Sequence, residues 1–148
     1  MISVSNNSIF TPENINTSSE SSISIILKNQ EFLTSKTSEI LIFEDDDLKW
    51  SEMKFTNKHF LGYLDDRPCF VSCLEESSPI GNAMMLSPLR SLLGRMPDAI
   101  FTICSRSLQI DNWFVSNQFC GSCGKKIKPH ETERAMICEC KNNLIYPT

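Results

Sequence analysis

Four cysteines near the carboxyl end of the chain have the residue type and the spacing of a metal site. Cys120 and Cys123 form a C-x2-C pair, and Cys138 and Cys140 form a second pair fourteen residues later. Four thiolates bind structural zinc tetrahedrally. A span this short has almost no apolar core, so a bound metal must supply its folding energy. The two pairs therefore predict a β-hairpin zinc ribbon.

The spacing of the cysteine pair that supplies the fourth ligand of this predicted site is irregular. The second pair is C-x-C, so its two sulfurs cannot form the same knuckle as the first pair. Cys140 is the predicted fourth ligand, and His130 in the intervening loop is the alternative nitrogen donor. The ordinary interpretation of a single loop histidine is a solvated side chain.

The elements that must position the ribbon lie upstream of it. Residues 1–22 are dominated by Ser, Asn and Thr, which predicts a flexible arm. Apolar, β-branched runs at residues 23–27 and 39–43 predict strands, and the turn residues 65–68 predict a hairpin between residues 60–64 and 69–74. Cys69 and Cys73 then share one face of a strand with Val71, so we expect both to be core residues.

Two helices are predicted after these strands. Ser87-Pro88 resembles a helix start and predicts a helix over residues 89–96, ended by Pro97. Apolar residues recur at spacings of three and four over 98–117, which predicts a second helix whose end, at Trp113 and Phe114, packs on the ribbon. Four consecutive acids at 44–47 predict a solvated turn rather than a cation site. We therefore expect a small α+β domain over residues 23–117 and a ribbon over 118–148.

The composition narrows the class of protein. Hydrophobic content of 41% and charged content of 22% are ordinary for a globular protein. The formal net charge of -4 gives no general attraction to nucleic acid or to anionic membranes. The sequence contains neither an apolar run long enough for a membrane span nor a basic, apolar leader. With seven cysteines clustered in metal-type pairs, we expect a cytoplasmic protein without a membrane partner.

A resemblance to a known family is carried by the ribbon and by the segment before it. The ribbon run is Trp113, five residues, FCGSCG at 119–124, TERAM at 132–136 and Tyr146-Pro147. This run resembles the zinc-ribbon segment of the NADH pyrophosphatase family of Nudix hydrolases. Residues 60–70 and 89–113 are similar to that family's N-terminal Nudix-like domain. The resemblance implies hydrolysis of NAD(H) to NMN(H) and AMP, including removal of NAD caps from RNA.

The resemblance also implies site residues and two departures from the family. Glu133 and Tyr146 match the family's positions at the dinucleotide pocket, and Lys141 stands where the family has its fourth zinc ligand. The family's catalytic Nudix domain follows the Tyr-Pro step and carries a glutamate-rich box that holds Mg²⁺ or Mn²⁺. None of the five glycines of this sequence opens such a box. We therefore expect no catalytic residue here and no activity of the chain alone.

These departures suggest a shortened or decaying gene product, or one half of a split enzyme. The expected cofactor is structural zinc, with Mg²⁺ or Mn²⁺ relevant only if a Nudix domain is supplied in trans. The expected partners are that separate Nudix domain, NAD(H) and a second copy of the chain. The alternative hypothesis is a non-enzymatic zinc-ribbon module that binds a protein or a nucleic acid.

Overall fold

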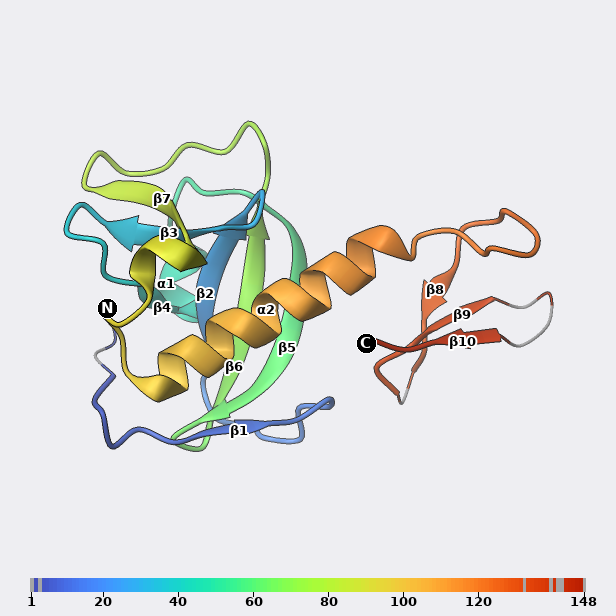
Figure 1. The fold of residues 1–148 in the computed structure, drawn as a ribbon, viewed down its shortest axis with the longest axis horizontal. Coiled ribbons are helices and arrows are strands. Elements are labelled where there is room, and N and C mark those ends of the chain that lie inside the picture. Colours follow the sequence, from blue (N-terminus) through green and yellow to red (C-terminus); the bar gives the residue numbers. More distant parts are fainter. Residues whose placement is uncertain (1, 3, 132, 139, 141–142, 148) are drawn as a thin grey trace.

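The structure, a computed structural model, describes residues 2, 4–131, 133–138, 140 and 143–147, with the backbone alone for 143–145. A sheet domain crossed by one long helix is followed by a small three-stranded sheet (Figure 1). The elements of the described residues are β1 (Phe10–Pro12), β2 (Ile23–Lys28), β3 (Glu31–Ser35), β4 (Ile42–Glu44), α1 (Asp45–Leu48), β5 (Phe55–Leu64), β6 (Arg67–Leu74), β7 (Met84–Pro88), the 3-10 helix η1 (Leu89–Leu92), α2 (Asp98–Ser116), β8 (Lys128–Pro129), β9 (Met136–Cys138) and β10 (Asn143–Ile145). The predicted α+β class is confirmed.

The large sheet has the strand order β1-β5-β6-β2-β3-β7, and β4 pairs with the remaining length of β2. β2 and β6 run parallel, and the other recorded pairs of this sheet are antiparallel. The predicted hairpin of β5 and β6 is confirmed. Its turn residues Asp65 and Asp66 both have positive φ, 46° and 70°. This is the conformation that matches the right-handed twist of the two strands.

Both faces of the sheet are covered. Ile23, Ile25 and Leu27 of β2 point to the face that α2 crosses, whereas Ile26 belongs to a second cluster on the opposite face. A strand covered on both sides shows no alternation of buried and exposed residues, and residues 23–27 are all buried, with Ser24 as the one polar residue among them. The predicted helix over 98–117 is confirmed as α2, which buries its apolar stripe on the first face.

Residues 1–22, for which composition predicts a flexible arm, contain a paired strand. β1 runs antiparallel to β5 with Thr11 opposite Tyr63. Gly62 allows this approach, because a Cβ at that position would lie 2.2 Å from the carbonyl oxygen of Thr11. Phe10 also packs against the main core. Scattered apolar residues in a polar segment thus find a place in the fold that composition alone does not reveal.

Other boundaries differ from the sequence-based expectation. The helix predicted over residues 89–96 is only the single turn η1, because Leu93 already leaves helical geometry with a ψ of 136°. The strand predicted over residues 39–43 is the shorter β4. Strands β3 and β7 were not predicted, and they pair with each other at one end of the sheet.

The acidic run 44–47, predicted as a solvated turn, begins the short helix α1. Asp45 accepts hydrogen bonds from the hydroxyl groups of Ser22 and Ser24, the latter at 2.6 Å, and from Lys58 Nζ at 2.9 Å. Burial alone would raise the pKa of Asp45, but these hydrogen bonds outweigh it and lower that pKa. The carboxylate thus ties α1 to the sheet. Within the described part of the chain, no helix has the length and hydrophobicity needed to cross a membrane.

Candidate metal centre and the adjoining hollow

The small sheet has the order β10-β9-β8 and brings the two cysteine pairs together. Cys120 lies in a tight turn in which its carbonyl oxygen accepts from the backbone N–H of Gly124 at 2.9 Å. Its own N–H donates to the carbonyl of Lys125 at 2.8 Å. Cys138 ends β9, and β10 returns antiparallel beside it. The turn and the strand end therefore present both pairs to the same point.

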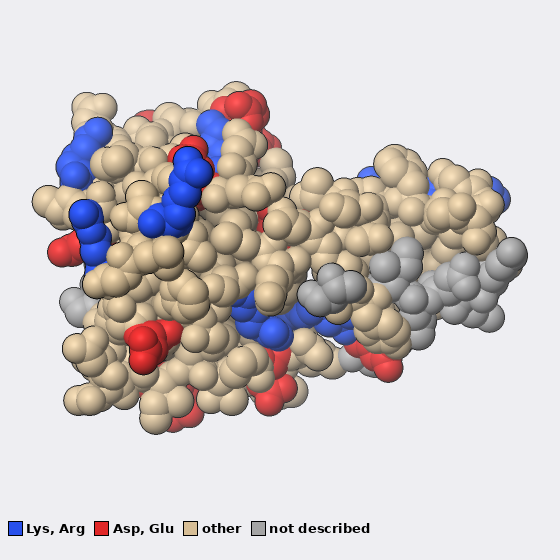
Figure 2. All heavy atoms as spheres, viewed as in Figure 1, with Lys and Arg blue, Asp and Glu red and all other residues tan. Residues whose placement is uncertain are grey.

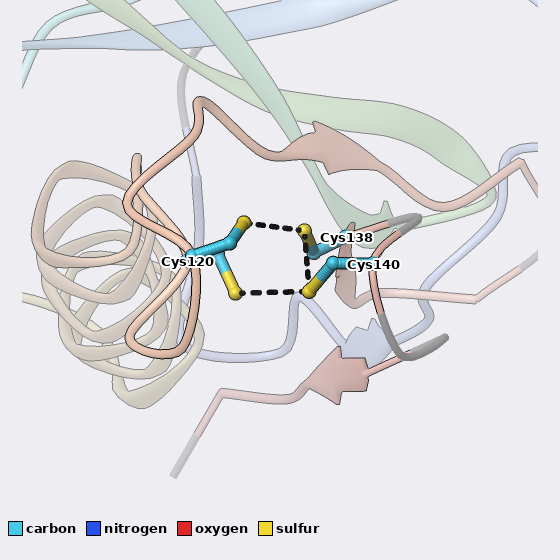
Figure 3. A group of neighbouring side chains, drawn as sticks. Cys120, Cys138 and Cys140 are labelled. Atoms are coloured by element: carbon cyan, nitrogen blue, oxygen red, sulfur yellow. Dashed lines mark hydrogen bonds between the residues drawn. The ribbon is translucent and has the colours of Figure 1, made fainter.

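The four predicted ligands form one cluster, in which every Sγ lies within 4.8 Å of the others. Cys120 Sγ is 3.7 Å from Cys140 Sγ, Cys123 Sγ is 3.5 Å from Cys138 Sγ, and Cys138 Sγ is 3.3 Å from Cys140 Sγ. Figure 3 shows Cys120 facing Cys138 and Cys140 across a small gap. A tetrahedral ion with Zn–S bonds of about 2.3 Å places its sulfurs about 3.8 Å apart. The thiols therefore fit a tetrahedral metal ion after small adjustments.

The electrostatics of the cluster suit a cation. The backbone N–H groups of Cys123 and Ser122 lower the pKa of the Cys120 thiol to about 6. The Ser122 nitrogen lies 3.4 Å from that sulfur. In contrast, the adjacent Cys138 thiol, together with burial and the other sulfurs, raises the pKa of Cys140 to about 12. One thiolate forms readily, and further ones require a positive ion to offset their charge.

The structure groups Cys140, and not His130, with the other three thiols. His130 Nδ1 instead accepts a hydrogen bond from the backbone N–H of Glu133 at 3.1 Å. Its backbone N–H donates to the carbonyl of Ala135 at 2.8 Å. His130 therefore shapes the hairpin before β9. Lys141, the residue at the family's ligand position, and Thr132 of the TERAM segment lie outside the described residues.

The ribbon packs on the end of α2. Its small core consists of Cys120, Ile127, Met136 and Cys138, and Trp113 and Phe114 of α2 pack against it. The expectation that this end of the helix contacts the ribbon is therefore confirmed. Cys120 and Cys138 belong to both the ribbon core and the cysteine cluster, so the cluster is part of the surface that docks on α2.

Two arginines hold the N-terminal segment against the ribbon and α2. Arg134 of the ribbon donates to the carbonyl of Phe60 and to Asn14 Oδ1, the latter at 3.3 Å. Arg106 of α2 donates to the same Asn14 oxygen and to the carbonyl of Glu13, both at 3.1 Å. Burial, with the charge of Arg106 adding to it, lowers the pKa of Arg134 to about 10. Among the described residues, neither guanidinium forms an ion pair with a carboxylate.

A hollow of about 580 Å³ opens where the ribbon meets this segment. We call it the ribbon hollow, and its lining is Glu13, Asn14, Ile15, Thr17, Tyr63, Glu133, Arg134 and Tyr146. Basic atoms gather at the same junction of domain and ribbon (Figure 2). The hollow therefore combines aromatic rings and carboxylates with nearby positive charge.

The resemblance-based residues Glu133 and Tyr146 lie together in the lining of the ribbon hollow. Tyr146 Oη donates a hydrogen bond to Glu133 Oε2 at 2.5 Å. Because Glu133 holds the phenol proton, it raises the pKa of Tyr146. Tyr146 is 49% exposed, so a planar ligand can reach its ring. Such a pair can stack on an aromatic ligand and accept a hydrogen bond from an amide.

Sequence reasoning assigned only Glu133 and Tyr146 of this lining and missed the other six residues, among them Asn14, Tyr63 and Arg134. Arg134 belongs to the TERAM segment, so its position beside Glu133 is the signal that could have found it. Tyr63 lies in the predicted hairpin, but only the pairing of β1 places it beside the N-terminal segment. For Asn14 the sequence offers no comparable signal.

Comparison with known proteins decides the family. The model of the NADH pyrophosphatase-like rudimentary NUDIX domain matches residues 21–113, which is more than half of the chain. The chain belongs to the NADH pyrophosphatase-like family. The matched range extends from just before β2 to Trp113 in the last turn of α2, and the ribbon lies beyond it.

Relatives of this NADH pyrophosphatase-like chain include the NAD-capped RNA hydrolase NudC of Deinococcus radiodurans, which is 36% identical over 87 residues. That alignment covers 59% of this chain and 30% of the relative. The NAD-capped RNA hydrolase NudC of Stutzerimonas stutzeri is 29% identical over 118 residues, or 80% of this chain and 42% of the relative. The NAD-capped RNA hydrolase NudC of Pseudomonas syringae pv. syringae is 28% identical over 100 residues, which is 68% of this chain and 36% of the relative. The chain thus spans less than half the length of these relatives.

Proposed function

We propose that this chain is the substrate-recognition and zinc-ribbon portion of an NADH pyrophosphatase-type protein. In this proposal the ribbon hollow receives the nicotinamide end of NAD(H), free or as the cap of an RNA. The observation that carries the proposal is the joint position of Glu133 and Tyr146 in that hollow. The printed names of the relatives, NAD-capped RNA hydrolases, support the same class of ligand.

Each residue has a distinct role in this proposal. The Tyr146 ring stacks on the nicotinamide, and Glu133 accepts a hydrogen bond from its carboxamide N–H. Arg106 and Arg134 supply the positive field that attracts the pyrophosphate, since neither is paired with a carboxylate in the described part of the chain. One zinc on Cys120, Cys123, Cys138 and Cys140 fixes the hairpin that carries Glu133.

Hydrolysis of the pyrophosphate requires metal-binding carboxylates that the described residues of this chain do not supply. Attack of water on a pyrophosphate builds charge on its oxygens, which Nudix enzymes neutralise with Mg²⁺ or Mn²⁺ held by several glutamates on one helix. The described helices of this chain carry no such array. A closed four-thiolate zinc also has no position for a water. We therefore propose that a separate Nudix domain supplies the reaction, and that a second copy of the chain is a further partner.

Titration of the chain with NADH by isothermal calorimetry tests the recognition step. Tyr146→Ala removes a stacking surface worth about 1–3 kcal/mol, which corresponds to a loss in affinity of about 5- to 150-fold. Tyr146→Phe keeps the ring and releases Glu133 from its hydrogen bond, so its affinity equals or exceeds that of the unmodified chain. Glu133→Gln weakens binding.

Glu131→Gln is the matched control, because Glu131 lies on the same hairpin but outside the lining of the ribbon hollow. We expect its affinity to be unchanged. If Tyr146→Ala binds NADH as well as the unmodified chain, the assignment of the hollow is wrong. If the chain does not bind NADH and instead retains a protein or an RNA without an NAD cap, the non-enzymatic module is the better description.

A further inference from the structure

A second group of metal-type donors lies beneath α2, remote in sequence from the cysteine pairs. His59 comes from β5, Cys73 from β6 and Asp111 from α2. In the β5–β6 register His59 is opposite Val71 and Asn57 is opposite Cys73, so both donors of the sheet lie on one face. α2 crosses that face and adds the carboxylate. The fold therefore brings one imidazole, one thiol and one carboxylate to a common point.

The donor atoms are close and buried. Cys73 Sγ lies 3.2 Å from Asp111 Oδ1, and His59 Nε2 lies 3.6 Å from the same oxygen. Every ligand atom of the three lies within 4.8 Å of the others. His59 and Cys73 are each 8% exposed. Such a site is shielded from water, and an unbalanced charge within it is costly.

An internal hydrogen-bond network accounts for only part of this arrangement. The thiol of Cys73 donates to Asp111, but His59 Nε2 is a buried atom without a hydrogen-bond partner in the described part of the chain. Leaving such an atom unsatisfied costs about 1–3 kcal/mol. The group is also not a nucleophilic triad, because the carboxylate and not the imidazole lies between the other two. His59 Nε2 contacts Asp111 Oδ1 at 3.6 Å, which is too long for a good hydrogen bond, so this atom lacks a close partner.

A tetrahedral transition-metal ion would be such a partner. Zinc bonds of about 2.3 Å to sulfur and about 2.0–2.2 Å to nitrogen and oxygen separate the donors by about 3.3–3.6 Å. The two distances to Asp111 match this within a few tenths of an ångström. A thiolate and a carboxylate also balance the double charge of the ion, so the filled site is neutral. We propose that His59, Cys73 and Asp111 form a second metal site that binds a divalent ion of the zinc class.

Three protein donors leave one position of a tetrahedral ion for water or another small ligand. A second hollow, of about 380 Å³, adjoins the ribbon hollow and has His59 in its lining together with Trp113 and Phe114. This hollow gives an ion or a small ligand a route to the site. The proposal does not depend on NAD(H) recognition, because the ligands of the site lie outside the ribbon hollow.

Metal stoichiometry tests the proposal. The intact chain is stripped with a chelator, titrated with Co²⁺ and then with Zn²⁺, and the bound equivalents are counted. We expect two equivalents for the unmodified chain and one for His59→Gln, with the affinity of the lost site reduced at least tenfold. The equivalent that His59→Gln loses has weaker thiolate-to-cobalt charge-transfer absorption than the retained four-thiolate site, since it contains one sulfur.

Cys73→Ala is the second variant and Cys104→Ala is its control, because Cys104, on the buried face of α2, is also a buried thiol but is not in the donor group. We expect Cys73→Ala to bind one equivalent fewer than Cys104→Ala. Thermal unfolding of each variant with chelator present shows whether it folds. If Cys73→Ala does not fold, His59→Gln decides. The proposal is overturned if His59→Gln binds as much metal as the unmodified chain. It is also overturned if Cys73→Ala and Cys104→Ala both fold and bind equal amounts of metal.

Discussion

Replacing Gly62 by alanine should detach the N-terminal segment from the sheet. Gly62 has a φ of 149°, which side-chain-bearing residues rarely adopt, and forcing it costs about 1–3 kcal/mol. The added Cβ would also lie 2.2 Å from the carbonyl oxygen of Thr11, so β1 must move by about 1 Å. This movement strains the flanking bonds, Glu13 N–H to Leu61 O and Asp65 N–H to Ile9 O, each worth about 1 kcal/mol. The total loss is about 3–5 kcal/mol.

Two further glycines separate the cost of backbone strain from the cost of the steric clash with β1. Gly94 has a φ of 78° but nothing within 4 Å of an added Cβ, so Gly94→Ala reports backbone strain alone, about 1–2 kcal/mol. At Gly81 an added Cβ meets the flexible Met84 side chain at 3.5 Å, and its substitution should cost less than about 0.5 kcal/mol. Urea unfolding followed by circular dichroism gives the three free energies. A Gly62→Ala cost equal to that of Gly94→Ala would refute the steric role of β1.

Two other outcomes follow from the cysteine cluster and from Asp45. Cys140→Ser should lower zinc retention as much as Cys120→Ser does, and chelation should unfold residues 120–146 while α2 and the sheet stay folded. Metal analysis with hydrogen exchange measures both, and full retention by Cys140→Ser would mean that another group completes the shell. The pKa of Asp45 is lowered in the folded state, so its carboxylate stabilises the fold fully at a pH above the ordinary pKa of 3.8. This stabilisation is lost as the pH falls through the folded-state pKa. Asp45→Asn should therefore flatten the acid side of the stability profile, and an unchanged profile would contradict this.

The sequence predicts those elements whose signals are local. The Asp65-Asp66 turn, the apolar run of β2 and the spacing in α2 each have a local physical cause, and the structure contains all three. The four cysteines are brought together as their spacing indicates. Their spacing could not decide between Cys140 and His130, because that choice depends on how the hairpin folds.

The rest of the fold depends on contacts between distant segments. β1 has a weak pattern and is held by pairing with β5 and by the absence of a side chain at Gly62. β3 follows an Asn29-Gln30 turn with φ of 49° and 66°, which is hard to recognise without a glycine. Cys73 is a core residue as its strand position predicts, but its contact with Asp111 joins positions 38 residues apart. The ribbon hollow likewise needs Asn14, which no local motif marks.

Our main proposal is that this chain recognises NAD(H) and that a Nudix domain hydrolyses it. Release of NMNH from NADH tests this proposal most directly. The purified chain is assayed with Mg²⁺ or Mn²⁺, first alone and then with a separately produced catalytic Nudix domain from a relative. The account predicts no release above a protein-free control for the chain alone. It also predicts turnover in the mixture that Tyr146→Ala reduces about fivefold or more. Turnover by the chain alone that survives repeated purification and falls with Glu133→Gln would contradict the account.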